Sequence, residues 1–270
     1  DISLTIRDIN VLKKEVEEAK HKSLASQAEL INYRKRKDEE VSNMLKYANQ
    51  DLILEIVQVM DNLERVKCQA MSDEIANLVE LSPMVYNAFS NTPRTPFVPV
   101  SINAFKLDAH PIGGNQWISS PLTVAKMTMA LKAENCDNIL EIGCGSGYQA
   151  AILAKIARRV FSVERIEALA NSAKSLMKNL GINNVFIRFD DGNLGWRSYA
   201  PYDRIILSCF CQSVPDRLFD QLKDDGILVA PVAKDNKQYI TQYKKSNGQI
   251  ISQILDECVF VPLLDGTEQR

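Results

Sequence analysis

An apolar run that leads directly into three alternating glycines constrains this chain more than any other feature. The segment Leu140–Ala150 reads L-E-I-G-C-G-S-G-Y-Q-A. A strand followed by a glycine-rich turn is typical of open α/β sheets, because the bare backbone lets a ligand approach closely. A dinucleotide-binding turn needs a third glycine three residues after the second. Tyr148 stands at that position, so the spacing argues against a pyrophosphate-binding turn.

Two further apolar runs end in acidic residues. Val160–Glu164 ends in a carboxylate that can accept both hydroxyls of a ribose, or can instead be a solvated strand end paired with Arg165. Val185–Arg188 is followed by Asp190-Asp-Gly192, which is a turn signal and also a place where an acid could bind an adenine amino group. Polar turns after three successive strands fit a ligand crevice at the carboxyl ends of an open α/β sheet.

More particular segments lie on both sides of the glycine turn. They are R-T-P-F-V-P at 94–99, P-I-G-G-N-Q-W-I-S-S-P at 111–121, V-E-R at 163–165, D-G-N-L-G-W at 191–196, A-P-Y-D at 200–203 and F-V-P-L at 260–263. Together with the glycine turn, they resemble the protein-L-isoaspartate O-methyltransferase family from about residue 64 to the C-terminus. The turn is shared by S-adenosylmethionine-dependent methyltransferases in general, whereas the first two segments are particular to this family. The resemblance implies a doubly wound, mostly parallel α/β sheet with an antiparallel strand near its end.

The resemblance also implies a role for individual positions. It places Ser119 at the substrate carboxylate and the cofactor sulfonium. The implied cofactor-binding residues are Gly143, Cys144, Gly145, Ser146, Gly147, Glu164, Asp191 and Gly192, and the implied peptide-binding residues are Ile112, Gln116, Ile118, Val261 and Pro262. S-adenosyl-L-methionine would be converted to S-adenosyl-L-homocysteine, the substrates would be isoaspartyl peptides and proteins, and no metal is expected.

The chemistry of this reaction agrees with the residues available. Methyl transfer to a carboxylate is a direct displacement, and the nucleophile is already ionised near neutral pH. No strong general base is needed, so alignment and exclusion of water are the expected contributions. A serine hydroxyl can donate one hydrogen bond that orients the attacking oxygen. Ser119 could instead cap the helix predicted at 122–131, but Ser120 fits that position better because Pro121 suits the first helical residue.

Four positions depart from the family pattern. Trp117 replaces a threonine, His110 a leucine, Asp190 a glycine and Val259 an arginine. We expect these changes to alter peptide preference or rate rather than cofactor binding. Enzymes of this fold that methylate nitrogen carry an Asn/Asp-Pro-Pro-aromatic segment after the fourth strand, whereas S-C-F-C-Q-S occupies 208–213 here. A methyltransferase acting on another carboxylate stays open, as does a non-enzymatic scaffold.

The first seventy residues contain no glycine and no proline. Apolar residues recur at intervals of three and four from Ile2 to Ala19 and again from Leu45 to Val66, which predicts a long helix with a coiled-coil seam. The segments N-Y-R-K-R at 32–36, K-Y-A at 46–48 and D-N-L-E-R at 61–65 resemble the dimerising helix of GrpE-type nucleotide exchange factors. This resemblance implies a homodimer. The wing through which that family contacts its chaperone is not recognisable, which weakens the case for chaperone binding.

Length and composition fit two unequal units. We expect a helical extension at 1–66 and a methyltransferase domain at 67–270. The net charge of −2 argues against nucleic-acid binding. Six cysteines without a C-x-x-C pair, no signal peptide and no membrane-spanning run favour a cytoplasmic protein with reduced thiols. Further helices are predicted at 146–157, 166–180 and 215–222, and strands at 204–208, 226–230, 239–243 and 259–263.

Overall fold

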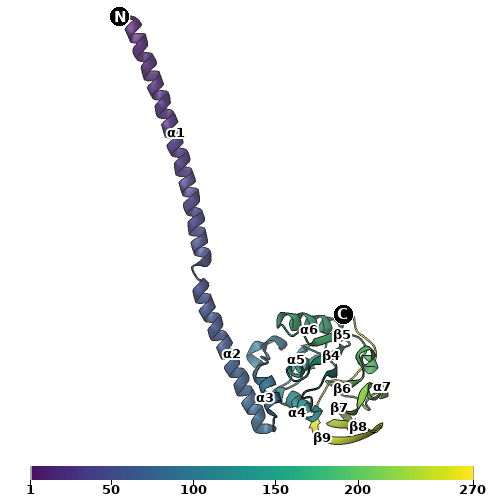
Figure 1. The fold of residues 1–270 in the computed structure, drawn as a ribbon. Coiled ribbons are helices and arrows are strands. Elements are labelled where there is room, and N and C mark those ends of the chain that lie inside the picture. Colours follow the sequence, from purple (N-terminus) through teal and green to yellow (C-terminus); the bar gives the residue numbers. More distant parts are fainter. Residues whose placement is uncertain (1, 270) are drawn as a thin grey trace. The chain divides into compact units, whose positions relative to one another are not determined.

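The computed structural model describes residues 2–269. The chain divides into two compact units, residues 1–62 and 63–270. The first unit holds helix α1 (Ile2–Tyr47) and the start of helix α2 (Gln50–Leu78) (Figure 1). The expected single helix over 1–66 is therefore interrupted at residues 48–49, where Asn49 is a weak helix former. Every side chain described between residues 7 and 62 is exposed, so the described part of the predicted seam is not buried within this unit.

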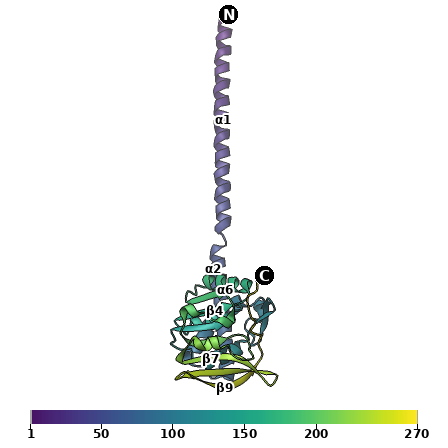
Figure 2. The same ribbon diagram turned by 90° about the vertical axis from the view of Figure 1, so that its right-hand side faces the viewer.

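The second unit is built on a seven-stranded sheet with the order β5-β4-β3-β6-β7-β8-β9. Its strands are β3 (Asn138–Ile142), β4 (Arg159–Glu164), β5 (Val185–Phe189), β6 (Tyr202–Leu207), β7 (Leu222–Lys234), β8 (Lys237–Ser246) and β9 (Gln249–Cys258). All neighbouring strands from β5 to β7 are parallel, and β8 pairs antiparallel with both β7 and β9. The predicted doubly wound sheet with an antiparallel strand near its end is confirmed. Figure 2 shows β4, β7 and β9 in succession, with β9 outermost.

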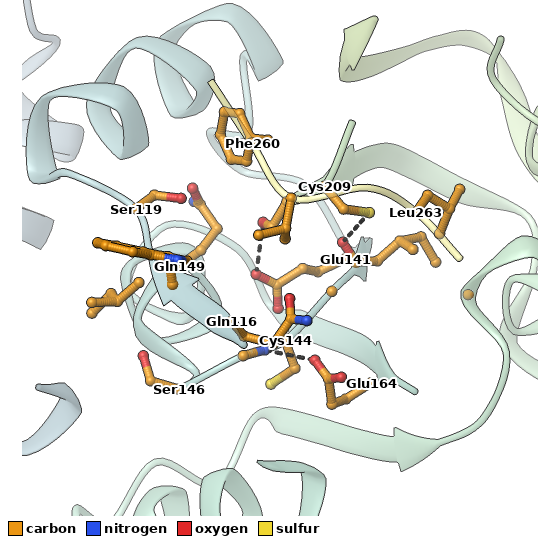
Figure 3. A pocket seen from close by; sticks show the side chains of 18 of the residues that line it. Gln116, Ser119, Glu141, Cys144, Ser146, Gln149, Glu164, Cys209, Phe260 and Leu263 are labelled. Atoms are coloured by element: carbon orange, nitrogen blue, oxygen red, sulfur yellow. Dashed lines mark hydrogen bonds between the residues drawn. The ribbon is translucent and has the colours of Figure 1, made fainter. Parts of the chain in front are cut away.

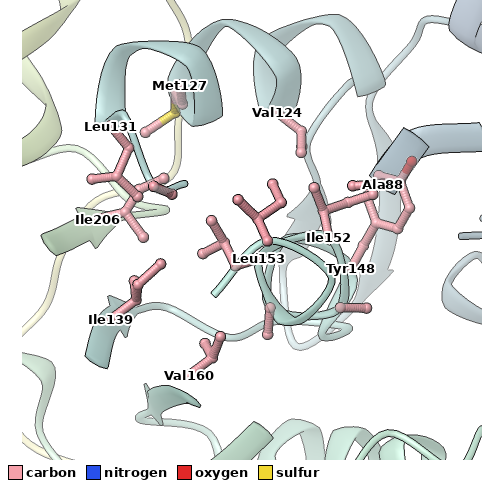
Figure 4. Packing of buried hydrophobic residues seen from close by; sticks show 14 of the residues in the cluster. Ala88, Val124, Met127, Leu131, Ile139, Tyr148, Ile152, Leu153, Val160 and Ile206 are labelled. Carbon is pink, nitrogen blue, oxygen red and sulfur yellow. The ribbon is translucent and has the colours of Figure 1, made fainter. Parts of the chain in front are cut away.

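Helices cover one face of this sheet, where the larger core lies. They are α3 (Pro83–Ser90), α4 (Pro121–Leu131), α5 (Tyr148–Ala154) and α6 (Glu167–Asn179). Figure 4 shows Ile139 and Ile206 from the sheet packing with Leu131 of α4 and Leu153 of α5. Because successive strand residues point to opposite faces, Leu140 lies in the second core cluster on the other face. Helix α7 (Asp216–Asp220) contributes Leu218 to that cluster.

Most predicted elements of the sheet region are present within a few residues, but the last strand is not where the pattern placed it. Residues 259–263 form no strand: they contain one isolated bridge, between Phe210 and Pro262, and Phe260 exchanges two hydrogen bonds with the Gln238 side chain of β8. The actual edge strand, β9, reads Q-I-I-S-Q-I-L-D-E-C and is largely exposed on both faces. It therefore lacks the alternation of apolar and polar residues by which a half-buried strand is recognised.

A short hairpin before α4 was also absent from the sequence prediction. Strands β1 (His110–Gly113) and β2 (Gln116–Ile118) pair antiparallel, with His110 opposite Ile118 and Pro111 opposite Trp117. The turn contains Gly114 and Asn115 at positive φ, a conformation that glycine and asparagine tolerate best. The hairpin places Gln116, Ile118 and the following Ser119 beside the glycine turn, where they form one wall of a cavity.

Candidate active site

A cavity lies at the carboxyl ends of β3 and β4, between the hairpin and the segment 260–264. Figure 3 shows Ser119, Gln149, Glu141 and Glu164 arranged around this cavity. The predicted residues that line it are Gln116, Ile118, Ser119, Gly143, Cys144, Gly145, Ser146, Glu164, Gly192, Val261 and Pro262. Residues far apart in the sequence thus meet where the crevice rule for open α/β sheets places a ligand.

The three glycines of the turn are required by the backbone itself. Gly143, Gly145 and Gly147 have φ values of +89°, +55° and +90°, in the region that other residues rarely adopt. At Gly147 an added Cβ would also lie 2.5 Å from Met177 Cε of α6. Gly147 therefore serves the turn and its packing rather than the cavity, whose lining does not include it.

Glu164 is buried at the end of β4 and is only 5% exposed. Its Oε2 accepts a hydrogen bond from Gly145 N at 2.8 Å, and its Oε1 accepts one from Ile166 N at 2.9 Å. Burial raises the pKa of Glu164, against the opposing effect of these backbone hydrogen bonds. Each carboxylate oxygen keeps a second lone pair for a ligand hydroxyl. The alternative of a solvated strand end paired with Arg165 is wrong, because Glu164 is buried and Arg165 pairs instead with Glu268, at 3.1 Å.

The structure places Asp191 differently from Gly192, its neighbour in the sequence. Gly192 lines the cavity, whereas Asp191 does not. The Asp191 carboxylate accepts hydrogen bonds from Asn193 N at 2.9 Å and from Gly266 N at 2.9 Å. Although burial raises the pKa of Asp191, these hydrogen bonds outweigh it, and the pKa is lowered overall. Its visible role is to anchor the C-terminal segment beside the turn, and adenine binding by its side chain stays a prediction.

The two adjacent serines before α4 have different surroundings. Ser120 Oγ accepts a hydrogen bond from Thr123 N at 3.1 Å and caps the helix, which confirms the predicted N-cap. Ser119 lines the cavity, and its hydroxyl has no hydrogen-bond partner among the described residues. Its backbone carbonyl accepts a hydrogen bond from Arg94 Nη2 at 2.9 Å. The hydroxyl is thus available to a substrate while the backbone is held.

Glu141 is a site residue that the sequence prediction missed. It lies in β3 with no exposed surface and lines the cavity. Ser162 Oγ donates to its carboxylate at 2.5 Å, and Ser208 Oγ is 3.4 Å away. Burial raises the pKa of Glu141 to about 8, against the effect of the Ser162 hydrogen bond. A glutamate inside an otherwise apolar strand was the available signal, because a buried carboxyl group needs a reason to be there.

The buried thiols at the site are poorly suited to nucleophilic chemistry. Cys144 and Cys209 both line the cavity. Burial raises the pKa of each thiol well above its ordinary value, so the reactive thiolate form is disfavoured. All cysteines in the described residues are free. No set of three His, Cys, Asp or Glu side chains in that part of the chain is arranged to hold a metal ion.

The remaining predicted positions lie at or beyond the edge of the cavity. Ile112 is not part of the lining, but its Cδ1 would be 3.3 Å from a Cβ at Gly145, so it packs against the turn from outside. Among the family departures, Trp117 lines the cavity and is 54% exposed, whereas Val259 is 90% exposed. His110 Nε2 contacts Asn103 O at 3.2 Å, an ordinary loop interaction.

A family model for protein-L-isoaspartate(D-aspartate) O-methyltransferase matches residues 65–268. The chain belongs to this family. The protein-L-isoaspartate O-methyltransferase of Helicobacter pylori strain G27 is 47% identical over 209 residues, which are 76% of this chain and 100% of that protein. That of Maricaulis maris strain MCS10 is 45% identical over 184 residues, covering 67% of this chain and 86% of that protein.

Solved structures agree with the observed fold. A protein-L-isoaspartate O-methyltransferase superposes with a TM-score of 0.66 at 25% identity, covering 73% of this chain and 65% of that chain. A structure from Plasmodium falciparum, described as a complex with S-adenosyl-L-homocysteine, has a TM-score of 0.66 at 22% identity. The match covers 73% of this chain and 98% of that chain. A GrpE family model matches residues 4–94 and so extends past residue 66 into the methyltransferase match. No helix among residues 2–269 has the length and apolarity to cross a membrane.

Proposed function

We propose that the cavity performs the reaction of this family, the transfer of a methyl group from S-adenosylmethionine to the free carboxylate of L-isoaspartyl residues in proteins. The observation that carries this proposal is the meeting of the glycine turn, the buried Glu164 and the unpartnered Ser119 hydroxyl around one cavity. The 47% identity to a protein-L-isoaspartate O-methyltransferase over that protein's full length supports it.

The residues fit an adenosylated cofactor. Glu164 presents lone pairs at the end of β4 for ribose hydroxyls, and the glycine turn offers bare backbone for the amino-acid portion. Gly192 also lines the cavity, and a Cβ there would lie 2.5 Å from Ile142 Cγ2, so glycine is needed at this position for packing against β3. When bound, S-adenosylmethionine supplies an electrophilic methyl group on a sulfonium.

The substrate carboxylate attacks this methyl carbon, the sulfur–methyl bond breaks, and a methyl ester forms. We assign to the Ser119 hydroxyl a hydrogen bond that orients the attacking oxygen without neutralising it. The hairpin and the segment 260–264 enclose the reacting groups, and enclosure limits water around the carboxylate. Because an isoaspartyl linkage moves the carboxylate by one methylene relative to aspartate, positioning alone can discriminate between the two.

The test uses paired peptides that differ only in aspartyl or isoaspartyl linkage, with S-adenosylmethionine labelled in its methyl group. We expect the label to enter only the isoaspartyl peptide, in a form released by mild base as expected of an ester. Equal labelling of both peptides would refute the specificity. Labelling of a small-molecule carboxylate with neither peptide labelled would favour the alternative of another carboxyl methyltransferase.

Replacing the catalytic serine gives a more local test. For Ser119→Ala we expect a fall in kcat of about tenfold to a hundredfold, since a hydrogen bond to a charged group contributes ~1.5–3 kcal/mol. S-adenosylmethionine affinity, measured by calorimetry, should stay within about twofold, because the Ser119 hydroxyl makes no hydrogen bond with the glycine turn or Glu164 among the described residues. A variant with unchanged turnover would show that Ser119 only lines the cavity.

For the N-terminal segment, we propose self-association as a coiled coil. The exposure of every described side chain from residue 7 to 62 and the GrpE match over 4–94 support this. Apolar residues on the seam include Leu12, which is 59% exposed, and Val16, which is 52% exposed. A second copy of this chain is the partner that repeats the same seam. The methyltransferase domain itself would begin near residue 67.

A further inference from the structure

Among the described residues, the largest fully buried side chain is a charged one. Arg94 has no exposed surface, and a buried guanidinium is costly unless its donors are satisfied. The ion pairs within 4.0 Å in the described part of the chain do not include it. The cost of burying this guanidinium is therefore offset in part by groups other than a carboxylate, while its Nε has no hydrogen-bond partner in the described residues.

Four backbone carbonyls take the place of a carboxylate. Arg94 Nη1 donates to the carbonyl oxygens of Ala104 and Lys106, at 3.1 and 3.2 Å. Its Nη2 donates to those of Asp108 and Ser119, at 3.0 and 2.9 Å. One side chain thus ties together both ends of the segment 104–119, which contains the hairpin and ends at the proposed catalytic serine.

The other side of the guanidinium meets the cofactor turn. Its Cζ lies 5.6 Å from the centroid of the Tyr148 ring, within the range of a cation–π interaction. Tyr148 follows Gly147 directly, is 2% exposed and lines the cavity. The Tyr148 ring also packs against Phe97, with centroids 5.4 Å apart, so it is fixed from two sides at the start of α5.

Arg94 therefore lies between the two halves of the site. The turn that we assign to the cofactor is on one side, and the segment that presents Ser119 to the substrate is on the other. The Ser119 hydroxyl has no hydrogen-bond partner among the described residues, so its location depends on its backbone. We propose that Arg94 is a positioning residue for methyl transfer, which sets the distance and orientation of Ser119 relative to the glycine turn. This inference rests on the proposed function.

Lysine cannot perform this role. Arginine presents a planar fork of donors with fixed directions, whereas lysine has a single nitrogen. Four carbonyls at 2.9–3.2 Å from two different nitrogens cannot all be reached from one ammonium group. Arg94→Lys keeps the positive charge and much of the apolar stem but should release part of the segment 104–119.

The experiment measures the two halves of the site separately in the full-length protein. For Arg94→Lys we expect S-adenosylmethionine affinity within about threefold of wild type, and kcat/KM for an isoaspartyl peptide lowered by on the order of tenfold to a hundredfold, as for a misplaced catalytic group. Amide hydrogen exchange should accelerate within 104–119 and stay unchanged in β3, β4 and β6.

Thr92→Val is the matched control. Thr92 is 3% exposed and lies two residues from Arg94, and its hydroxyl has no hydrogen-bond partner in the described residues. The substitution perturbs the same buried region while removing a group that bonds nothing there, so it should be neutral. In Thr92→Val, peptide turnover, cofactor affinity and amide hydrogen exchange should all match the wild type.

Three results would overturn the proposal. The first is an unchanged kcat/KM in Arg94→Lys. The second is a loss of cofactor affinity as large as the loss of kcat/KM, and the third is accelerated amide hydrogen exchange over the whole sheet. Either of these last two results would indicate a purely structural role for Arg94. If Arg94→Lys does not fold, Arg94→Ala with millimolar guanidinium chloride replaces it. Peptide turnover should then be restored by guanidinium and not by sodium chloride, and equal restoration by both would also refute the proposal.

A failure of the proposed function is recognised separately. If the wild-type protein does not label the isoaspartyl peptide, the substrate assignment fails. The exchange measurement still decides whether Arg94 holds the segment 104–119, because it needs no substrate.

Discussion

At the scale of single residues, Glu164 holds the site together before any ligand binds. Its two carboxylate oxygens accept hydrogen bonds from the backbone of Gly145 and Ile166. It therefore joins the glycine turn of β3 to the turn after β4. Arg165, directly after it, pairs with Glu268 instead, which leaves the remaining lone pairs of Glu164 for a ligand.

We predict that Glu164→Ala weakens S-adenosylmethionine binding by ~1–3 kcal/mol, the range for leaving hydroxyl partners unpaired. Calorimetric titration measures this directly. Asp190→Asn is the matched control, because Asp190 also lies at the carboxyl end of a strand but pairs with Arg188 at 2.6 Å and lies outside the cavity lining. The S-adenosylmethionine affinity of Asp190→Asn should stay within about twofold of the wild type. Equal affinities for Glu164→Ala and wild type would mean that Glu164 only supports the turn.

Glu141 makes the stability of the folded protein depend on pH. Its pKa is raised from 4.5 to about 8 by burial, so the folded state holds a proton that the unfolded state releases above pH 4.5. The contribution of this group to stability is present below pH 4.5 and is lost as the pH rises toward 8. In Glu141→Gln the side chain is neutral at every pH.

Without cofactor, the melting temperature of Glu141→Gln relative to wild type should therefore rise between pH 5 and pH 8. Each kcal/mol of change in the free energy of unfolding shifts the melting temperature by about 2–4 °C for a domain of this size. Thermal scans of both proteins at several pH values test this. A constant difference across that range would show that Glu141 does not titrate there.

At the scale of elements, Ser120 is the N-cap of α4, and we assign it a structural role only. Ser120 Oγ accepts from Thr123 N and lies 2.9 Å from Thr123 Oγ1. Ser120→Ala should lower the stability of the methyltransferase unit by ~1 kcal/mol, the usual cost of losing an N-cap. Its kcat should match the wild type, in contrast to Ser119→Ala. Chemical denaturation and steady-state assays distinguish the two serines, and a larger loss of kcat in Ser120→Ala would reverse the assignment.

The sheet elements also show where sequence patterns fail. Strands β3, β4 and β6 are buried, and their apolar runs identify them. Strand β9 is an exposed edge with apolar residues on both faces, including Ile251 at 63% exposure and Ile254 at 47%. The run at 259–263 is apolar for another reason, since Val261 and Pro262 line the cavity.

At the scale of the whole molecule, the two units should separate cleanly. The Helicobacter pylori relative is matched over 100% of its length by 209 residues of this chain, so a complete relative corresponds to the methyltransferase unit. Removing residues 1–62 should leave a folded protein with unchanged S-adenosylmethionine affinity. Light scattering should give a dimer for the full chain and a monomer for the shortened one. A full chain that is monomeric at micromolar concentration would refute the proposed self-association.

Paired substitutions test the seam itself. Leu12→Ser with Val16→Ser removes apolar side chains from the seam and should produce monomers. Lys13→Ser with Glu17→Ser changes the adjacent faces, with the same spacing, and should leave the dimer intact. Dissociation by both pairs would mean that helix content rather than the seam controls assembly.

The sequence by itself determined the buried parallel strands and the glycine turn, because both depend on local rules. Three glycines are needed where φ is +89°, +55° and +90°, and apolar runs are needed where strands are covered on both faces. The N-cap at Ser120 is equally local. The same local logic identified the N-terminal helix, apart from its interruption at 48–49.

Only the tertiary structure decided which polar side chains face the cavity and which hold the fold. Asp191 is bound to Gly266, 75 residues away, Glu141 to Ser162, and Arg94 to the carbonyl of Ser119. These partners come from elements that meet only after the sheet has formed. A carboxylate or guanidinium looks the same in a sequence whether it binds a ligand or a backbone group, because its role is set by burial and by the nearest donor or acceptor.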